Sequence, residues 1–369
     1  MNSKQIFENY FALADVRIDG NRPWDIQVHN TGFYSRVLAG GSLALGESYM
    51  DGWWDCQQLD EFFSKVLCAE LDKQVRSKSA IWGVIRAKLM NLQSRKRAYE
   101  VGKKHYDIGN ELYEVMLDKN MAYSCGYWDQ AGNLDQAQEA KLDLSCRKLG
   151  LKKGMKVLDI GSGWGSFAKY AAEKYGVEVV GITISEEQVK LAIKRGEGLP
   201  VEYRLQDYRL LNEQFDRIIS IGMIEHVGEK NYSTYMGVAH RCLKSGGLFL
   251  LHTIGGNRSV SSTEPWIDKY IFPNSMLPSV KQLAAAAEKL FVLEDWHSFG
   301  TDYDKTLLAW YDNFTRGWEH IKGKYDQRFY RMWEYYLLSS AGSFRSRKNQ
   351  LWQIVFSKEG VEGGYQSIR

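Results

Sequence analysis

The residues best suited to chemistry follow short apolar segments, and the clearest case is a glycine-rich loop. Residues 156–160 (KVLDI) run directly into Gly161-Ser162-Gly163-Trp164-Gly165. Glycines let the backbone approach a ligand closely, and the start of a following helix offers unpaired N–H groups. A dehydrogenase loop has the spacing GxGxxG, whereas this loop has GxGxG with Asp159 two residues before the first glycine. The pattern predicts a site for S-adenosylmethionine, whose amino-acid carboxylate and ribose take the place of a pyrophosphate.

Polar residues also follow the next two apolar segments. The segment 178–182 continues into Thr183 without the acid that often holds ribose hydroxyls in methyltransferases, so Thr183 and Gln188 are predicted to contact the ribose or the methionine part. After 201–205, the run Gln206-Asp207-Tyr208 supplies a carboxylate able to accept from an adenine amino group. Taken alone, each of these residues fits a helix cap or a surface group better. The position at a strand end favours a ligand role for Asp207.

These loops require a scaffold of alternating strands and helices. Strands are predicted near 156–160, 178–182, 201–205, 215–221, 247–254, 291–297 and 351–356, and helices over 134–149, 164–175, 186–195 and 230–242. Continuous apolar strands alternating with helices indicate a mostly parallel sheet covered on both faces. The predicted fold class is α/β: a Rossmann-like class I methyltransferase with a seven-stranded sheet, plus a smaller N-terminal α+β domain.

The length of 369 residues predicts two domains, because single cores rarely grow beyond about 250–300 residues. Residues 1–92 are predicted to form an accessory, lipid-docking domain, 93–104 a basic linker and 105–369 the catalytic domain. The five cysteines are scattered, which fits reduced thiols in the cytoplasm, and neither they nor the histidines have metal-ligand spacing, so no metal is predicted. No signal peptide or membrane-spanning run is readable.

Basic residues are concentrated in one segment. Between Lys73 and Lys104 there are ten lysines and arginines against one acid, Glu100, which gives +9 in a chain whose net charge is +3. Such segregation indicates a polyanionic partner, either a lipid surface or a nucleic acid. Residues 79–92 have apolar side chains at helical spacing and could lie in a lipid interface or pack on their own domain. Arg95, Lys96 and Arg97 are the candidate lipid-docking residues.

Several blocks together resemble the bacterial cyclopropane-fatty-acyl-phospholipid synthases. They occur in the family's order over nearly the whole chain: GESYMDG (46–52), HYDIGN (105–110), YSCGYW (123–128), DIGSGWG (159–165), GITIS (181–185), EHVG (225–228), LHTIG (251–255) and FGTDY (299–303). The one departure noted is Ser162, where the glycine loop of many relatives has a cysteine.

The resemblance implies a site for each of two small molecules. Tyr123, Ser124, Gly161, Gly163, Thr183, Gln188 and Asp207 would surround S-adenosylmethionine, and Asp159 and Gln206 complete the predicted cofactor contacts. Cys125, Glu225, His252, Ile254 and Tyr303 would form a catalytic pocket that holds bicarbonate. The resemblance also implies a homodimer, associated peripherally with the inner face of the membrane, whose partner is a bilayer with unsaturated acyl chains rather than a nucleic acid.

The implied reaction adds a methylene across a cis double bond of a phospholipid acyl chain. Methyl transfer to a weakly nucleophilic alkene leaves a carbocation, and loss of a proton from the new methyl group closes the ring. The pocket must therefore exclude water and hold a base. Glu225 could accept the O–H of bicarbonate and increase its basicity, or could remove the proton itself. Cys125 has no adjacent base, so by itself it resembles a small buried apolar residue rather than a nucleophile.

The sequence leaves open two enzymatic alternatives and one non-enzymatic one. The same cofactor could serve methyl branching of a fatty acyl chain or N-methylation of a small amine; the combination of Glu225, His252 and Tyr303 favours ring closure. A non-enzymatic module that binds lipid or nucleic acid through the basic segment would leave the cofactor loop unexplained.

Overall fold

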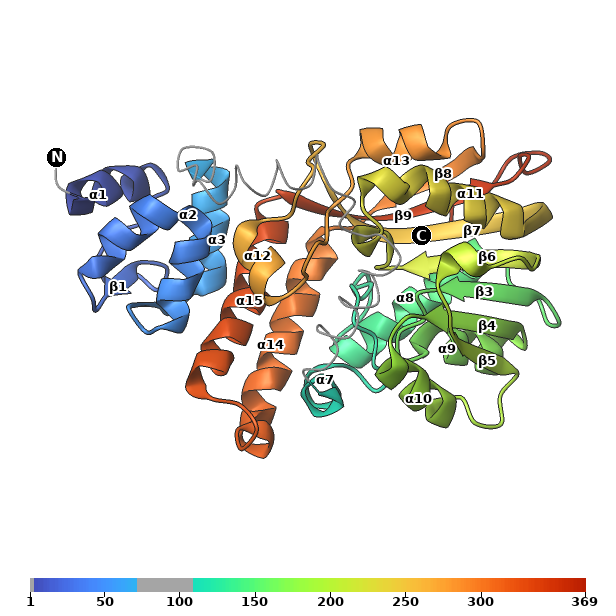
Figure 1. The fold of residues 1–369 in the computed structure, drawn as a ribbon, viewed down its shortest axis with the longest axis horizontal. Coiled ribbons are helices and arrows are strands. Elements are labelled where there is room, and N and C mark those ends of the chain that lie inside the picture. The colour runs from blue at the N-terminus through green and yellow to red at the C-terminus, as the bar shows by residue number, and fades with distance from the viewer. Residues whose placement is uncertain (1–2, 72–108) are drawn as a thin grey trace. The chain divides into compact units, whose positions relative to one another are not determined.

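Two sets of chain segments form two compact units. The computed structural model describes residues 3–71 and 109–369 (Figure 1). The first unit takes its described residues from 3–71, 261–273 and 303–349, and the second from 109–260, 274–302 and 350–369. The chain therefore crosses between the units several times. The predicted boundaries of domain and linker at 92 and 104 lie outside the described residues and stay a prediction.

The second unit is built on a seven-stranded sheet of order β5-β4-β3-β6-β7-β9-β8. Parallel pairing joins β3 to β4 and β6, β4 to β5, and β6 to β7, while β8 is antiparallel to β9. The strands are β3 (Lys156–Ile160), β4 (Glu178–Thr183), β5 (Val201–Leu205), β6 (Phe215–Ile221), β7 (Leu243–Gly256), β8 (Val292–Ser298) and β9 (Asn349–Ser357).

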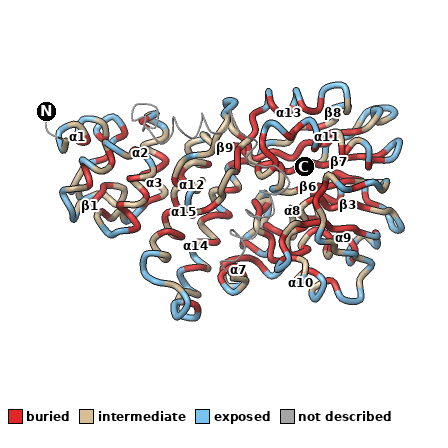
Figure 2. The backbone as a smooth tube through the Cα atoms, in the orientation of Figure 1, coloured by how far each residue is buried: buried red, intermediate tan, exposed pale blue. Residues whose placement is uncertain are grey.

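Side chains alternate between the two faces of this sheet, and each face has its own core. Leu158 and Ile160 pack with helices α11 (Tyr232–Cys242) and α13 (Val280–Ala287) on one face. Val157 packs with α8 (Leu134–Lys148) and α9 (Ser166–Tyr175) on the other. Figure 2 shows the central strands as mostly buried. Because both faces are covered, these strands can be apolar along their whole length.

The remaining elements of this unit are short helices. They are α7 (Asn110–Met116), α10 (Glu186–Arg195), η1 (Tyr208–Leu210), η2 (Ile224–His226) and η3 (Glu229–Asn231). Helix starts carry local caps: Ser185 accepts from the N–H of Gln188, and Ser279 and Gln282 form a capping box at α13.

The predicted fold class is confirmed. All seven predicted strands are present, although β7 begins at Leu243 rather than 247 and β9 extends over Asn349–Ser357. The predicted helices are also present, with starts shifted to Ser166 and Tyr232 in α9 and α11. The predicted amphipathic segment 79–92 lies outside the described residues.

The first unit is mainly helical, with one small sheet. Its elements are α1 (Ser3–Leu13), α2 (Gly32–Met50), α3 (Leu59–Cys68), α12 (Pro265–Tyr270), α14 (Thr301–Ile321), α15 (Gln327–Arg345) and the antiparallel pair β1 (Ile26–Val28) and β2 (Trp54–Cys56). Helix α15 packs against α2 and α3. Arg345 at the end of α15 pairs with Asp60 and Glu61 of α3 and with Asp304 of α14. A late segment of the chain thus completes the core begun by the N-terminal helices.

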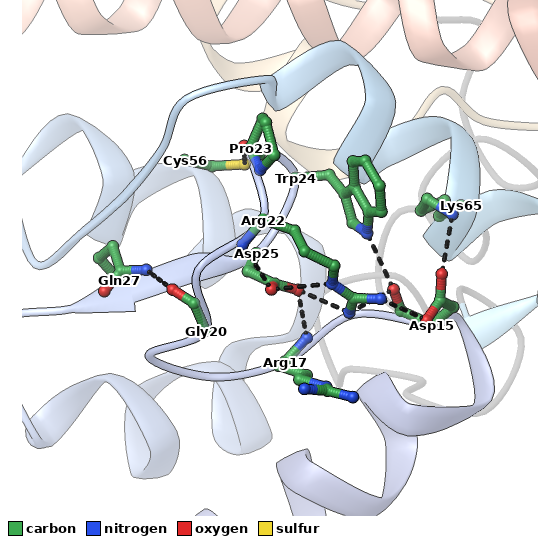
Figure 3. Close-up of polar contacts among 10 residues, drawn as sticks. All are labelled: Asp15, Arg17, Gly20, Arg22, Pro23, Trp24, Asp25, Gln27, Cys56 and Lys65. Atoms are coloured by element: carbon green, nitrogen blue, oxygen red, sulfur yellow. Dashed lines mark hydrogen bonds and ion pairs between the residues drawn. The ribbon is translucent and has the colours of Figure 1, made fainter.

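A polar cluster fixes the loop between α1 and β1 (Figure 3). The Arg22 guanidinium donates to both Asp25 and Asp15, at 2.8 and 2.6 Å. Asp25 is buried and also accepts from the backbone N–H of Arg17 at 2.8 Å. Lys65 of α3 reaches Asp15 at 3.2 Å, which ties the loop to the helix. The bidentate geometry suits a planar guanidinium and explains an arginine here.

Within 3–71 and 109–369, no helix combines the length and apolar character needed to cross a bilayer.

Close packing of α15 on α3 depends on Gly342. A Cβ at this position would lie 2.4 Å from the Asp60 carbonyl oxygen and 2.8 Å from the Phe63 Cβ. We predict that Gly342→Ala destabilises this unit by about 2 kcal/mol, because the added methyl group would force the backbone of α3 and the Phe63 side chain to move. Thermal unfolding followed by circular dichroism measures the loss. The control is Gly323→Ala in the same unit, where a Cβ meets nothing within 4 Å; equal melting temperatures for the two variants would contradict the packing argument.

Candidate active site

The carboxyl ends of β3, β6 and β7 lie side by side at one edge of the sheet. These strands are neighbours and run parallel, so the residues that follow them meet at the same edge. Open α/β sheets bind ligands at this edge. The glycine loop follows β3, Glu225 lies in η2 just after β6, and His252 lies near the end of β7.

The glycine loop is shaped to receive a ligand. The N–H groups of Gly161 and Ser162 both donate to the Ile182 carbonyl, at 2.9 and 3.0 Å, which anchors the loop on β4. Gly163 has φ +55°, and a Cβ there would meet nothing within 4 Å. The Ser162 hydroxyl is buried without a hydrogen-bond partner in the described residues. Open space beside an unpaired hydroxyl fits the polar amino-acid part of S-adenosylmethionine.

Thr183 and Gln188 are brought together as the sequence suggested. The Thr183 hydroxyl donates to Gln188 Oε1 at 2.8 Å, and both side chains are buried, Thr183 at the end of β4 and Gln188 in α10. The Gln206 N–H donates to the Thr183 carbonyl at 2.9 Å, which joins the ends of β4 and β5. Their contact with the cofactor stays a prediction.

Asp207 is buried at the end of β5, but its carboxylate already has partners. Arg209 donates its Nε to Oδ1 at 2.8 Å and its Nη2 to Oδ2 at 2.6 Å. The Arg209 backbone N–H also donates to Oδ1, at 2.9 Å, so Asp207 caps η1. A carboxylate has about four acceptor positions, so the predicted adenine contact would share Asp207 with the arginine.

The segment Tyr123–Cys125 lies against α8 and an aromatic wall. Tyr113 packs on Tyr123 and on Trp164 of the glycine loop, with ring centroids 5.1 and 4.7 Å apart. The Ser124 hydroxyl accepts from Lys141 Nζ at 2.9 Å. Cys125 is buried and its thiol donates to the Gly126 carbonyl at 3.1 Å. The aromatic rings thus connect two predicted cofactor-binding blocks that lie forty residues apart in the chain.

Glu225 is buried with one of its carboxylate oxygens unpaired. Oε1 accepts from the Ile254 N–H at 2.7 Å, whereas Oε2 has no hydrogen-bond partner in the described part of the chain. Burial raises the pKa of Glu225 to about 7. The Ile254 N–H, predicted to donate to bicarbonate, here donates to Glu225. The predicted role of Ile254 would therefore require the ion to share or take over this donor.

His252 is held as a neutral ring whose Nε2 carries the proton. The Ser145 hydroxyl donates to the Lys141 carbonyl at 2.8 Å, so it must accept from the Gln353 amide nitrogen at 3.1 Å. The same nitrogen lies 3.3 Å from His252 Nδ1, which must therefore accept. Burial lowers the pKa of His252 well below its ordinary value, so the ring is neutral and the proton sits on Nε2. That buried N–H has no partner among the described residues.

The two unpaired atoms complement each other chemically. Glu225 Oε2 can accept a hydrogen bond and His252 Nε2 can donate one, and both are shielded from water. Buried polar atoms in native proteins are almost always paired, so two unpaired ones at neighbouring strand ends indicate a ligand that both donates and accepts. Among the described residues, no group of three or more His, Cys, Asp or Glu side chains is arranged to hold a metal ion.

Two further predicted residues have different surroundings. Asp159 is buried beneath the glycine loop, and burial raises its pKa to about 7, an effect that the nearby Lys141 charge opposes. Tyr303 belongs to the first unit, where its ring packs on Phe344 at 4.5 Å; its place in the catalytic pocket stays a prediction. Arg95, Lys96 and Arg97 lie outside the described residues.

Sequence reasoning missed Lys141, Gln138 and Gln353. Lys141 occupies a position in α8 where the helical spacing of apolar residues predicts a buried side chain, so a lysine lies on the buried face of this helix. Gln353 interrupts the apolar run of β9. The sequence does show a polar residue at a position where the pattern predicts a buried side chain. It does not show which group that residue contacts.

Known proteins of similar sequence belong to the family that the sequence motifs resemble. Residues 93–354 match the family model of mycolic acid cyclopropane synthetase. The chain is 56% identical over 370 residues to the cyclopropane-fatty-acyl-phospholipid synthase of Escherichia coli K12, covering 100% of this chain and 96% of that protein. The chain belongs to the cyclopropane synthase family. This confirms the predicted family and the enzyme class, an S-adenosylmethionine-dependent methyltransferase.

Solved structures of this cyclopropane synthase family are also similar. MmaA2 from Mycobacterium tuberculosis has a TM-score of 0.67 at 30% identity, over 70% of this chain and 98% of that one. CmaA1 complexed with SAH and CTAB has a TM-score of 0.65 at 31% identity, with the same coverage. Coclaurine N-methyltransferase, at 20% identity and a TM-score of 0.69 over 85% of this chain and 99% of that one, shares the fold.

The tautomer of His252 can be measured. We predict that His252 remains neutral with the proton on Nε2 from about pH 5.5 to 8, although an unperturbed histidine titrates near 6.5. Long-range ¹H–¹⁵N spectra of ¹⁵N-histidine-labelled protein report both properties, and His252→Gln assigns the signal. A proton on Nδ1, or titration close to 6.5, would contradict the hydrogen-bond argument.

Proposed function

We propose that this chain transfers a methylene from S-adenosylmethionine across the cis double bond of unsaturated phospholipid acyl chains. The observation that carries the proposal is a pair of buried atoms, Glu225 Oε2 and His252 Nε2, that have no partner among residues 3–71 and 109–369. They lie just after β6 and near the end of β7, in a sheet where β6 neighbours both β7 and β3, the strand that leads into the glycine loop. The strong similarity to a protein named cyclopropane-fatty-acyl-phospholipid synthase supports the substrate class. A similar protein of 31% identity was solved with SAH, the product that S-adenosylmethionine leaves after methyl transfer.

The chain's own residues would exclude water, orient the cofactor and provide or hold a proton acceptor. S-adenosylmethionine, when bound, offers an electrophilic methyl group. The glycine loop and Ser124 would hold its amino-acid end, and Thr183, Gln188 and Asp207 its adenosyl part. The acyl chain becomes cationic after methyl transfer, and water would trap that cation, so the burial of Glu225 and His252 serves the ring-closing step.

The proton from the new methyl group needs an oxygen base. The two unpaired atoms fit bicarbonate, whose O–H would donate to Glu225 Oε2 while another oxygen accepts from His252 Nε2–H. Cys125, Ile254 and Tyr303 are the further predicted contacts. Bicarbonate would supply a base that leaves after protonation, whereas direct use of Glu225 would require its carboxylate to be ionised near its pKa of about 7.

Methyl branching of a fatty acyl chain is the second candidate, because some relatives of lower identity are named as fatty acid methyltransferases. One is called a probable fatty acid methyltransferase in Pseudomonas putida, at 37% identity over 70% of this chain and 69% of that protein. Incubating the purified protein with monounsaturated phospholipid vesicles and labelled cofactor, followed by mass spectrometry of the lipids, separates the outcomes. Ring-specific fragments support the proposal; a branched or unmodified product overturns it.

We also propose a peripheral position at the inner face of the membrane and a homodimeric assembly. The basic segment 73–104 supports the first, since a double bond lies within about 15 Å of the bilayer surface and the chain must be drawn out of the lipid. The second rests on the family resemblance alone.

Replacing Glu225 should abolish ring formation. Glu225→Gln keeps an oxygen that can accept from Ile254 but loses the negative charge, and we predict at least about a 100-fold fall in turnover with unchanged affinity for S-adenosylhomocysteine. The matched control is Glu229→Gln, an exposed carboxylate in the adjoining η3, which should keep wild-type turnover. Wild-type turnover in Glu225→Gln would remove Glu225 from the reaction.

Depleting bicarbonate decides between the two bases. We predict that removing dissolved carbon dioxide and bicarbonate from the wild-type assay slows product formation, and that adding bicarbonate restores it. Turnover is measured by incorporation of label into lipid. Indifference to both treatments would make Glu225 the base.

Removing the positive charge of Arg95, Lys96 and Arg97 tests their assignment as lipid-docking residues. Because each basic residue near an anionic surface contributes about 1 kcal/mol, replacing all three with alanine should weaken binding to anionic vesicles by at least about tenfold. Vesicle sedimentation at two salt concentrations measures this. Unchanged sedimentation of the triple variant would remove the assignment.

A further inference from the structure

A lysine is buried behind the predicted cofactor site with very few partners. Lys141 lies in α8 and is 1% exposed. Its ammonium donates to Ser124 Oγ at 2.9 Å, and in the described residues it makes no other hydrogen bond and no ion pair. A buried charge without a close counterion is costly. Its retention at this place points to a use in the site.

The single hydrogen bond fixes the direction of the Ser124 hydroxyl. An ammonium group can only donate, so Ser124 Oγ accepts from Lys141 and its own proton must point to another acceptor. Gln138, one turn earlier in α8, donates to the Ser124 carbonyl at 2.7 Å. Two side chains of one helix therefore hold Ser124 from behind. Within the described residues no acceptor is seen for the Ser124 proton, which leaves it available to a ligand.

The charge around this hydroxyl favours an anionic ligand group. Its source is the Lys141 ammonium, which lies 2.9 Å from Ser124 Oγ. Asp118 and Asp159 oppose this preference, but burial raises the pKa of both carboxyls, to about 7 for Asp159, which reduces their negative charge. Asp118 is already occupied by the N–H groups of Asn120 and Ala122. S-adenosylmethionine has one carboxylate, on its amino-acid part, and the open space above Gly163 could receive that part.

We propose that Lys141 is a positioning residue for the cofactor, which orients the Ser124 hydroxyl to donate to the α-carboxylate and thereby selects adenosyl ligands that bear one. This rests on the proposed function, since it takes S-adenosylmethionine as the ligand of this edge of the sheet. It goes beyond that function by naming the residue that discriminates between ligands with and without a carboxylate.

The test compares two ligands that differ only in the carboxylate. Isothermal titration calorimetry measures the affinity for S-adenosylhomocysteine and for decarboxylated S-adenosylhomocysteine. Wild type should prefer the first, and Lys141→Met should lose about tenfold in affinity for it while changing less than twofold for the second, as expected for one hydrogen bond strengthened by charge. Retained binding of the second ligand shows that the variant site is folded.

A matched control is available on the same helix. Lys148 is also fully buried in α8 and donates to His297 Nδ1 at 3.0 Å, so Lys148→Met removes an equally buried ammonium elsewhere and should keep the ligand preference.

Ser124→Ala should reproduce the loss seen in Lys141→Met, and the double variant should bind no more weakly than Ser124→Ala. The Ser124→Ala variant alone still tests the proposal if Lys141→Met does not fold. Equal loss for both ligands, or no loss in Ser124→Ala, overturns the proposal. Failure of wild type to bind either ligand would instead overturn the proposed function and this inference with it.

Discussion

Desolvation of unpaired polar atoms is the constraint on which this site depends. Glu225 Oε2, His252 Nε2 and Ser162 Oγ are buried at the carboxyl ends of three neighbouring strands, without partners in the described residues. Each unpaired group costs about 1–3 kcal/mol. Their shared position at the carboxyl ends of neighbouring parallel strands, where open α/β sheets bind ligands, favours a ligand that completes them, and the sheet holds all three on one rigid edge.

A chain of hydrogen bonds connects the two halves of the site. His252 accepts from Gln353, Gln353 donates to Ser145, and Ser145 donates to the backbone of Lys141. The side chain of Lys141 then donates to Ser124 at the predicted cofactor site. The ring that faces the proposed base and the hydroxyl that faces the proposed cofactor therefore both depend on helix α8, and the ring also depends on Gln353 of β9.

Much of this arrangement is readable from the sequence. Apolar runs predict all seven strands, and the spacing GxGxG with Asp159 predicts the loop, because strands buried on both faces and close backbone approach leave local signatures. The placement of Glu225 and His252 at strand ends follows from the same reasoning. Local pattern does not reveal the pairing of Asp207 with Arg209 or the use of the Ile254 N–H by Glu225, because both depend on side-chain geometry formed only in the folded sheet.

Longer-range organisation is also beyond local pattern. Residues 303–349 pack with the N-terminal helices through Gly342 and Arg345, although the sequence places them inside the predicted catalytic domain. Lys141 and Gln353 are visible as polar residues at core positions, but their partners come from α8, β7 and the segment 123–125. Tertiary contacts of this kind form only when segments distant in the chain come together in the folded protein.

The central claim is that a base in this dry pocket removes a proton from the transferred methyl group. Mass spectrometry of lipid formed from a donor with a CD₃ methyl group tests it most directly. The account predicts a cyclopropane that carries two of the three deuterium atoms on its ring methylene. A product that retains all three, in an unclosed methyl branch, would contradict it.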